Sequence, residues 1–257
     1  TKMIVLGGTN DTLYSYTTVT PYTIQGAIYD LVSFSVTAKE TVPTGFTFNS
    51  DGTKIYIIGS TSDSVHEYTL STAYLVSTML FSSTLAIANP VPTSVKFNPL
   101  GTKMYIAGNT GDFVYEYTLS TAFLLSSATL TTSLYVGDVD LSPQDAEFNS
   151  DGTEMYLLGY EKRAIHTYSV STPYTLATAN HISTSYNMPN DAVFNGISII
   201  NNGTSLIFTG NTDIYQMPIS TPYDISTAVY GLPANTPAAP ILYLPMTDAS
   251  TAHINSG

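Results

Sequence analysis

The sequence predicts an all-β fold, a five-bladed β-propeller with four antiparallel strands per blade, from three observations. One segment is written three times, as "FNSDGTKIYIIG" from Phe48, "FNPLGTKMYIAG" from Phe97 and "FNSDGTEMYLLG" from Phe148. Each copy combines turn residues with β-branched and aromatic residues, which is typical of a hairpin. No segment shows a sustained 3.6-residue apolar period with caps, so we expect almost no helix.

The spacing of the copies gives the number of blades. The residue before the repeated Gly-Thr pair is Asp51, Leu100, Asp151 and Asn202, at intervals of 49, 51 and 51 residues. Five units of this length account for the chain of 257 residues. The units fall at about 1–52, 53–101, 102–152, 153–203 and 204–257, within a single domain. An open β-solenoid is the alternative, but solenoid repeats are usually shorter and contain no four-stranded meander.

The elements of a unit follow a constant order. Residues 148–152 predict a short strand that ends in an Asx/Gly turn, where Asp-Gly supplies a left-handed conformation at low cost. Residues 102–108 predict the second strand, 109–112 a polar tip and 113–119 the third strand. The alternation in 126–136 is looser, which indicates an outer, partly solvated strand.

Aromatic residues recur at fixed slots of the unit. The chain has 20 tyrosines and no tryptophan. One slot holds Tyr56, Tyr105 and Tyr156, and a second holds Tyr22, Tyr74, Phe123, Tyr174 and Tyr223. Repeated slots predict packing between blades, with each hydroxyl reaching a partner or water.

The unit "FNxDGTKMYxxG…VYEYxLSTPY" resembles the propeller repeats of phage tail and virion proteins and of bacterial surface proteins. It is also similar to the "SPDG" and "YVTN" repeats of other propellers. The resemblance covers four units, from residue 3 to about 223, and implies a propeller on a virion or cell surface, outside the cell. Propellers serve in binding, scaffolding and catalysis alike, so the fold alone does not give the function.

The chain begins with the second strand of a blade, "KMIVLGG". We therefore expect a C-terminal strand to pair with this blade and close the ring, because an exposed inner edge invites aggregation. Two segments qualify, "PILYLP" (240–245) and "AHINSG" (252–257). In the alternative, "ILYLPMTDASTAHINSG" opens a further domain, since it resembles the first strand of a concanavalin-like lectin module.

Composition excludes several classes of partner. With 7 basic and 19 acidic residues, the formal net charge of −12 repels phosphate backbones and anionic lipid surfaces, so we expect no nucleic-acid partner. No run of 18 apolar residues is present, so we expect no membrane insertion. Neither cysteine nor an HExxH or GxSxG motif occurs, and we expect no metal, no cofactor and no catalytic residue of those types.

Function is expected where the copies differ, because residues repeated in every blade serve the scaffold. The fourth unit carries "YEKRAIH" (160–166), with the only tight charge cluster, and the third unit carries "GDVDLSPQD" (137–145), with closely spaced acids. A solvated loop and a coil are the alternative interpretations of these segments. The candidate ligand-binding residues are Tyr160, Glu161, Lys162, Arg163, Asp138 and Asp140.

The sequence as a whole favours a non-enzymatic surface module for adhesion, display or assembly, which recognises a glycan, a protein or other parts of a larger assembly through its rim loops. The alternative is a carbohydrate-active hydrolase with carboxylates in the central funnel, for which Glu40, Glu147 or Glu154 could serve. Two non-repeated acids within about 10 Å of each other in the channel would favour the hydrolase. A channel lined by equivalent small or apolar residues would exclude it.

Overall fold

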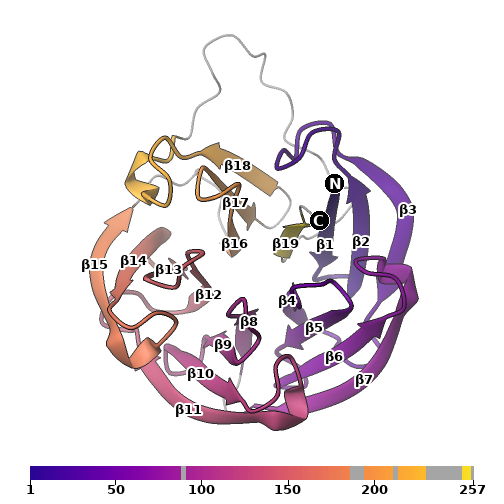
Figure 1. Cartoon of the computed structure of the whole chain (residues 1–257), viewed down its shortest axis with the longest axis horizontal. Helices are drawn as coiled ribbons and strands as arrows, with labels where there is room; N and C mark the ends of the chain where they lie inside the picture. Colours follow the sequence, from indigo (N-terminus) through magenta and orange to yellow (C-terminus); the bar gives the residue numbers. More distant parts are fainter. Residues whose placement is uncertain (88–90, 186–193, 211–213, 230–250, 256–257) are drawn as a thin grey trace.

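The computed structural model is a ring of five antiparallel sheets around a common axis (Figure 1). It describes residues 1–87, 91–185, 194–210 and 214–229, together with the backbone of 251–255. Within this part of the chain, four sheets have four strands and one has three. The predicted five-bladed β-propeller is confirmed.

Each blade is a meander that runs from the axis outward. The first blade contains β19 (Thr251–Asn255), β1 (Lys2–Gly7), β2 (Thr12–Thr17) and β3 (Ile28–Ser35). The second contains β4 (Pro43–Phe48), β5 (Lys54–Gly59), β6 (Ser64–Leu70) and β7 (Met79–Ala86). The third contains β8 (Pro92–Phe97), β9 (Lys103–Gly108), β10 (Phe113–Leu119) and β11 (Ala128–Tyr135).

The fourth blade contains β12 (Pro143–Phe148), β13 (Glu154–Gly159), β14 (Ala164–Val170) and β15 (Ala179–Ser185). The described strands of the fifth are β16 (Phe194–Ile200), β17 (Ser205–Gly210) and β18 (Ile214–Pro218). The helices of the described residues are the three-residue 3-10 turns η1 (Val76–Thr78), η2 (Leu125–Ser127), η3 (Leu176–Thr178) and η4 (Ile225–Thr227). None of them has the length and apolarity that crossing a bilayer requires.

The innermost strand lies earlier in the chain than the sequence predicts. Only Phe148 of the "FNSDG" segment belongs to β12, and residues 149–152 form the turn. The preceding "PQDAE" lacks a strand-like apolar alternation, and Asp145 and Glu147 stand on β12 where an apolar pattern is expected. The third strand has the predicted bounds, Phe113–Leu119.

The turn after β12 explains the repeated Asp-Gly. Asp151 accepts hydrogen bonds at Oδ1 from the backbone N and the Oγ1 of Thr153, at 3.1 and 2.6 Å. Gly152 has φ +75°, and a Cβ atom there would lie 2.3 Å from the ring of Tyr174. The Asp is thus a turn residue, as predicted, and the Gly is required both by its conformation and by the close approach of the ring.

A C-terminal strand closes the ring. β19 pairs antiparallel with β1, from Lys2 opposite Asn255 to Leu6 opposite Thr251. The prediction of closure is confirmed, with the segment that begins "AHIN" as the closing strand. The other segment considered, residues 240–245, lies outside the described residues.

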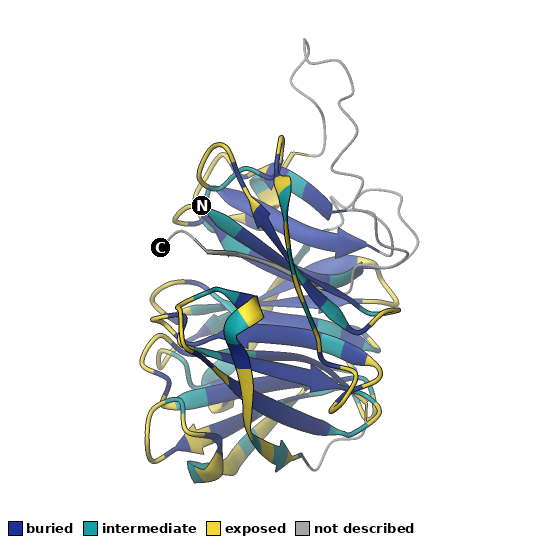
Figure 2. Ribbon diagram, turned by 90° about the vertical axis from the view of Figure 1, so that its right-hand side faces the viewer, coloured by how far each residue is buried: buried dark blue, intermediate teal, exposed yellow. Residues whose placement is uncertain are grey.

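The core lies in the seams between blades. In one seam, Ile58 and Val65 of the second blade pack in a single buried cluster with Val95, Met104 and Ile106 of the third. Figure 2 shows the inner strands buried, while exposure concentrates in the loops and along the outer strands. The apolar faces of each sheet are therefore covered by its two neighbours, as in other closed all-β rings.

The tyrosine slot fastens three of the seams. The hydroxyls of Tyr56, Tyr105 and Tyr156 donate to the backbone oxygens of Phe123, Tyr174 and Tyr223 in the next blade, at 2.6, 2.6 and 2.9 Å. Burial raises the pKa of all three phenols, so each is a permanent donor. The predicted packing role, with the hydroxyl reaching a partner, is confirmed.

A charged clamp runs beside two of these hydroxyls. Lys103 binds Glu116 at 2.9 Å and donates to the Tyr174 oxygen at 2.8 Å, while Glu116 accepts from the backbone N of Leu176 at 2.8 Å. Lys54 and Glu67 form the same arrangement one seam earlier. These contacts tie the starts of η2 and η3 to the blade before each of them.

Candidate ligand-binding pocket

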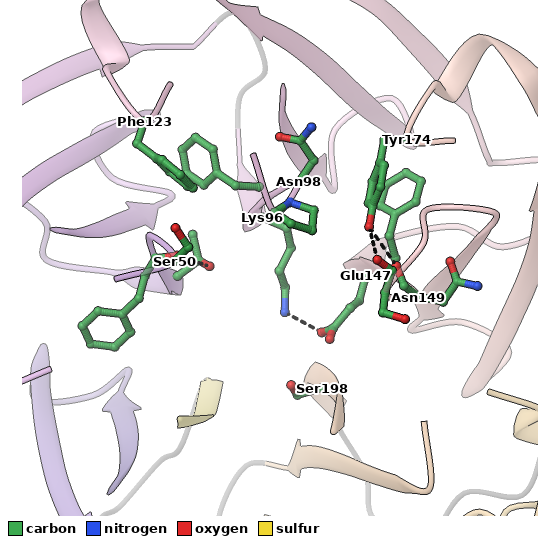
Figure 3. Close-up of a pocket in the computed structure, with 14 residues that line it drawn as sticks. Ser50, Lys96, Asn98, Phe123, Glu147, Asn149, Tyr174 and Ser198 are labelled. Atoms are coloured by element: carbon green, nitrogen blue, oxygen red, sulfur yellow. Dashed lines mark hydrogen bonds and ion pairs between the residues drawn. The ribbon is translucent and has the colours of Figure 1, made fainter. Parts of the chain in front are cut away.

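A pocket of about 250 Å³ lies where the innermost strands of three adjoining blades end (Figure 3). Its walls come from the ends of β4, β8 and β12, the turns after them, one residue of β16, and the loops that follow β10 and β14. The labelled lining residues are Ser50, Lys96, Asn98, Phe123, Glu147, Asn149, Tyr174 and Ser198.

Four of the lining residues occupy an equivalent position on four of the innermost strands, β4, β8, β12 and β16. Thr47, Lys96, Glu147 and Ser198 each stand opposite the third residue of the following strand. We call this set the ring position. In the first blade, the equivalent position of the inner strand is His253, which lies opposite Ile4. The residue type differs in every blade, whereas the flanking turns and tyrosine slots are largely repeated.

A charged cluster links the third, fourth and fifth blades at this level. Lys96 Nζ lies 2.9 Å from Glu147 Oε2 and 3.3 Å from Asp145 Oδ2. It also donates to the backbone oxygen of Ile197 at 3.2 Å. These contacts occupy all three ammonium protons of Lys96.

The two carboxylates also bind the edge of β16. Asp145 accepts from the backbone N of Ile197 at 2.9 Å and from that of Ala146 at 2.8 Å, and its side chain is fully buried. Glu147 accepts from the backbone N of Ile199 at 3.2 Å and keeps 17% of its side chain exposed. Asp145 is therefore committed to the scaffold, while Glu147 also faces the pocket.

Burial sets the electrostatics of the cluster. Burial raises the pKa of Glu147, an effect that Lys96 opposes and Asp145 reinforces. For Lys96, burial favours the neutral amine, but the two carboxylates outweigh it and raise the pKa. Lys96 therefore carries its charge at neutral pH.

Aromatic pairs and free hydroxyls complete the pocket. Phe97 and Phe123 lie with ring centroids 5.4 Å apart, and Phe148 and Tyr174 with centroids 5.6 Å apart. The side-chain amides Asn98 and Asn149 are bound within their own turns. Among the residues that the structure describes, no partner binds the hydroxyls of three lining serines, Ser50, Ser150 and Ser198.

The candidate residues predicted from the sequence lie elsewhere, at the opposite end of β12. The 160–163 loop follows Gly159, which pairs with Pro143, whereas the pocket lies at the Phe148 end. Tyr160, Glu161, Lys162, Arg163 and Asp138 are exposed there. Their role as ligand-binding residues stays a prediction.

Asp140 joins the two predicted segments. It is buried, accepts from the backbone N of Glu161 at 3.0 Å and of Lys162 at 3.1 Å, and lies 2.9 Å from His166 Nε2. Lys162 also donates its ammonium to the oxygen of Val139. Asp140 thus shapes the loop that carries the exposed charges.

The acids named for a hydrolase are separated by the fold. Glu40 is buried under the tip of its own blade, and Glu154 accepts from Tyr156 at 2.5 Å. Glu147 lines the pocket, and the buried Asp145 stands beside it on β12, an acid that β4, β8 and β16 replace by Gly45, Ser94 and Gly196. Both carboxylates lie within 3.3 Å of one nitrogen, so the pair satisfies the separation of about 10 Å set for a hydrolase.

Comparison of the ring position along the copies could have found this pocket from the sequence. Thr47, Lys96 and Glu147 directly precede the last residue of their inner strands, and Ser198 stands two residues before the end of β16. That signal is visible only once the segment before "FN" is read as the inner strand.

No protein-family model and no curated protein matches the chain. Similar solved structures include a candidate 6-phosphogluconolactonase from Bacteroides uniformis, with 12% identity, a TM-score of 0.55, and coverage of 97% of this chain and 72% of that one. A second, from Bacteroides fragilis, has 11% identity, a TM-score of 0.54, and coverage of 89% and 80%. A functionally unknown protein from Desulfotomaculum acetoxidans has 10% identity, a TM-score of 0.52, and coverage of 90% and 66%. At these identities the likeness establishes the propeller fold alone.

Proposed function

We propose that this protein is a non-enzymatic binding module whose ligand occupies the pocket at the ends of β4, β8 and β12. The observation that carries the proposal is the ring position, which changes from Thr47 to Lys96, Glu147 and Ser198 within an otherwise repeated scaffold. A rigid repeated frame with individual side chains at one mouth suits recognition.

The ligand class that fits best is a saccharide unit. Partly exposed aromatic rings offer flat apolar faces, and the free serine hydroxyls and Glu147 offer hydrogen-bonding groups from several sides. The proposed setting is a virion or cell surface, where the module takes part in adhesion, display or assembly. The resemblance of its repeats to phage tail and bacterial surface propellers supports that setting.

A glycan array followed by calorimetry on the hits tests the proposal. Ser50→Trp and Ser150→Trp place large side chains at two exposed walls of the pocket and should weaken binding at least roughly tenfold. A variant with alanine at 161, 162 and 163 tests the rim loop in parallel. Loss of binding only in that variant would place the ligand on the loop and contradict the pocket.

A hydrolase is the second candidate, favoured by the proximity of Asp145 and Glu147 and by the raised pKa of Glu147, a property of general acids. The names of two structural neighbours make 6-phosphogluconolactone the first compound to assay, followed by aryl glycosides. Turnover by the unmodified protein that disappears in Glu147→Gln would establish this candidate in place of a pure binding role.

A further inference from the structure

The charge balance of the pocket is unequal. One ammonium, that of Lys96, faces two carboxylates, those of Asp145 and Glu147. Lys96 is the only cationic residue among those that line the pocket in the described part of the chain. Asp51 and Asp151 follow the lining serines Ser50 and Ser150 in the sequence and add negative charge to the surrounding turns.

Lys96 is not available to an anionic ligand. Its three protons go to Glu147, Asp145 and the oxygen of Ile197. A phosphate or carboxylate would have to displace a carboxylate that the protein supplies, and would meet like charge within the same enclosed space. The pocket therefore disfavours anions although it contains a lysine.

Glu147, in contrast to Lys96, is available to a ligand of opposite charge. It is the one carboxylate that lines the pocket among the described residues, and its second oxygen accepts only from the backbone N of Ile199, at 3.2 Å. Burial raises its pKa, and the opposing effect of Lys96 does not cancel the combined effect of burial and Asp145. A cation beside Glu147 would supply the missing compensation.

The aromatic walls add a second attraction for a cation. The pairs of Phe97 with Phe123 and of Phe148 with Tyr174 line the pocket, and Figure 3 shows Phe123 and Tyr174 on either side of Lys96, whose ammonium meets the Glu147 carboxylate. The negative face of an aromatic ring attracts ammonium groups. The hydroxyls of Ser50, Ser150 and Ser198 suit a polar ring more than an alkyl chain, because they stand on three different blades.

From these contacts we infer that the ligand is an amino sugar with a free, protonated amine, which binds Glu147 while its hydroxyls meet the pocket serines. The inference rests on the proposed binding function and narrows its ligand. The inference adds only the preference for an amine to the proposed binding of a saccharide. Comparing a neutral sugar with an amino sugar that has the same ring therefore tests the preference separately from the binding.

The test is a calorimetric titration of the unmodified protein with four sugars at about pH 6, where the amine of glucosamine is protonated. Glucosamine should bind roughly tenfold more tightly than glucose and N-acetylglucosamine, and glucose 6-phosphate should bind most weakly. Glu147→Gln should reduce the affinity for glucosamine to that for glucose. The matched variant Glu154→Gln makes the same change in a carboxylate of the same blade outside the pocket, and should keep the preference.

The outcomes separate the two claims. Equal binding of glucosamine and glucose, or tightest binding of glucose 6-phosphate, would overturn the inference and leave a saccharide-binding pocket. Absence of binding by all four sugars would overturn both. The titrations of the unmodified protein with the four sugars test the preference for the amine even if Glu147→Gln fails to fold.

Discussion

At the scale of single residues, the repeated Gly of each turn has two roles. It adopts a positive φ, and it leaves room for an aromatic ring. Gly152 adopts φ +75° and also leaves room for the Tyr174 ring, which a Cβ would approach to 2.3 Å. The same contact recurs between Gly52 and Tyr74 and between Gly101 and Phe123. The turn and the aromatic slot, which lie about twenty residues apart, are therefore one structural unit.

Gly152→Ala should destabilise the protein by about 2 kcal/mol or more, because left-handed strain and displacement of the Tyr174 ring add together. Gly111→Ala is the matched control, since φ is +84° there but the nearest side-chain atom lies at 3.4 Å, and it should cost only about 1 kcal/mol. Urea unfolding monitored by circular dichroism measures both. Equal losses would show that the ring contact contributes nothing.

At the scale of elements, the seams between blades differ in how many hydrogen-bonding groups meet at the tyrosine hydroxyl and at the backbone oxygen that it binds. The Tyr174 oxygen accepts from Tyr105 and also from Lys103. Tyr156 shares its one hydroxyl proton between the Tyr223 oxygen and the Glu154 carboxylate. The first blade carries Ile4 at the register of the tyrosine slot, so its seam with the second blade is without that phenol.

Tyr156→Phe should therefore cost about 2 kcal/mol and Tyr105→Phe about 1 kcal/mol, since the Tyr174 oxygen keeps the lysine as donor after the second substitution. Thermal and urea unfolding of the two variants provide the comparison. A larger loss for Tyr105→Phe would mean that the lysine does not replace the phenol.

The sequence predicted the repeated elements well and the inner strand poorly. The hairpin copies, the third strand and the tyrosine slots follow from turn chemistry and apolar periodicity that five blades share. The inner strand β12 carries Asp145 and Glu147 because its side chains meet other strands near the axis, an environment that exists only after the ring closes. The pocket does not follow from the sequence for the same reason, although Glu147 is one of the three acids that the sequence offers for a hydrolase.

At the scale of the whole molecule, stability depends on closure. β19 covers the inner edge of β1 through residues 251–255. The first blade would otherwise present an unpaired edge toward the axis, which is an aggregation hazard.

Removal of residues 251–257 should lower the melting temperature by several degrees, and should produce association that rises with protein concentration. Differential scanning calorimetry and sedimentation velocity measure the two effects. Removal of 256–257 alone leaves β19 intact and is the control. A truncated protein that melts like the full chain and stays monodisperse would show that β19 does not stabilise the ring.

The ring position has a consequence for how such a protein can evolve. Its side chains stand at the mouth of the disc, while the tyrosine slots that fasten the seams are opposite them on the next strand. Substitutions at Thr47 and Ser198, which hydrogen-bond to no other blade among the described residues, can therefore accumulate without disturbing the joints, whereas changes at Lys96 and Glu147 also alter contacts between blades. A change of ligand preference therefore needs no change in the repeated turns or in the tyrosine slots.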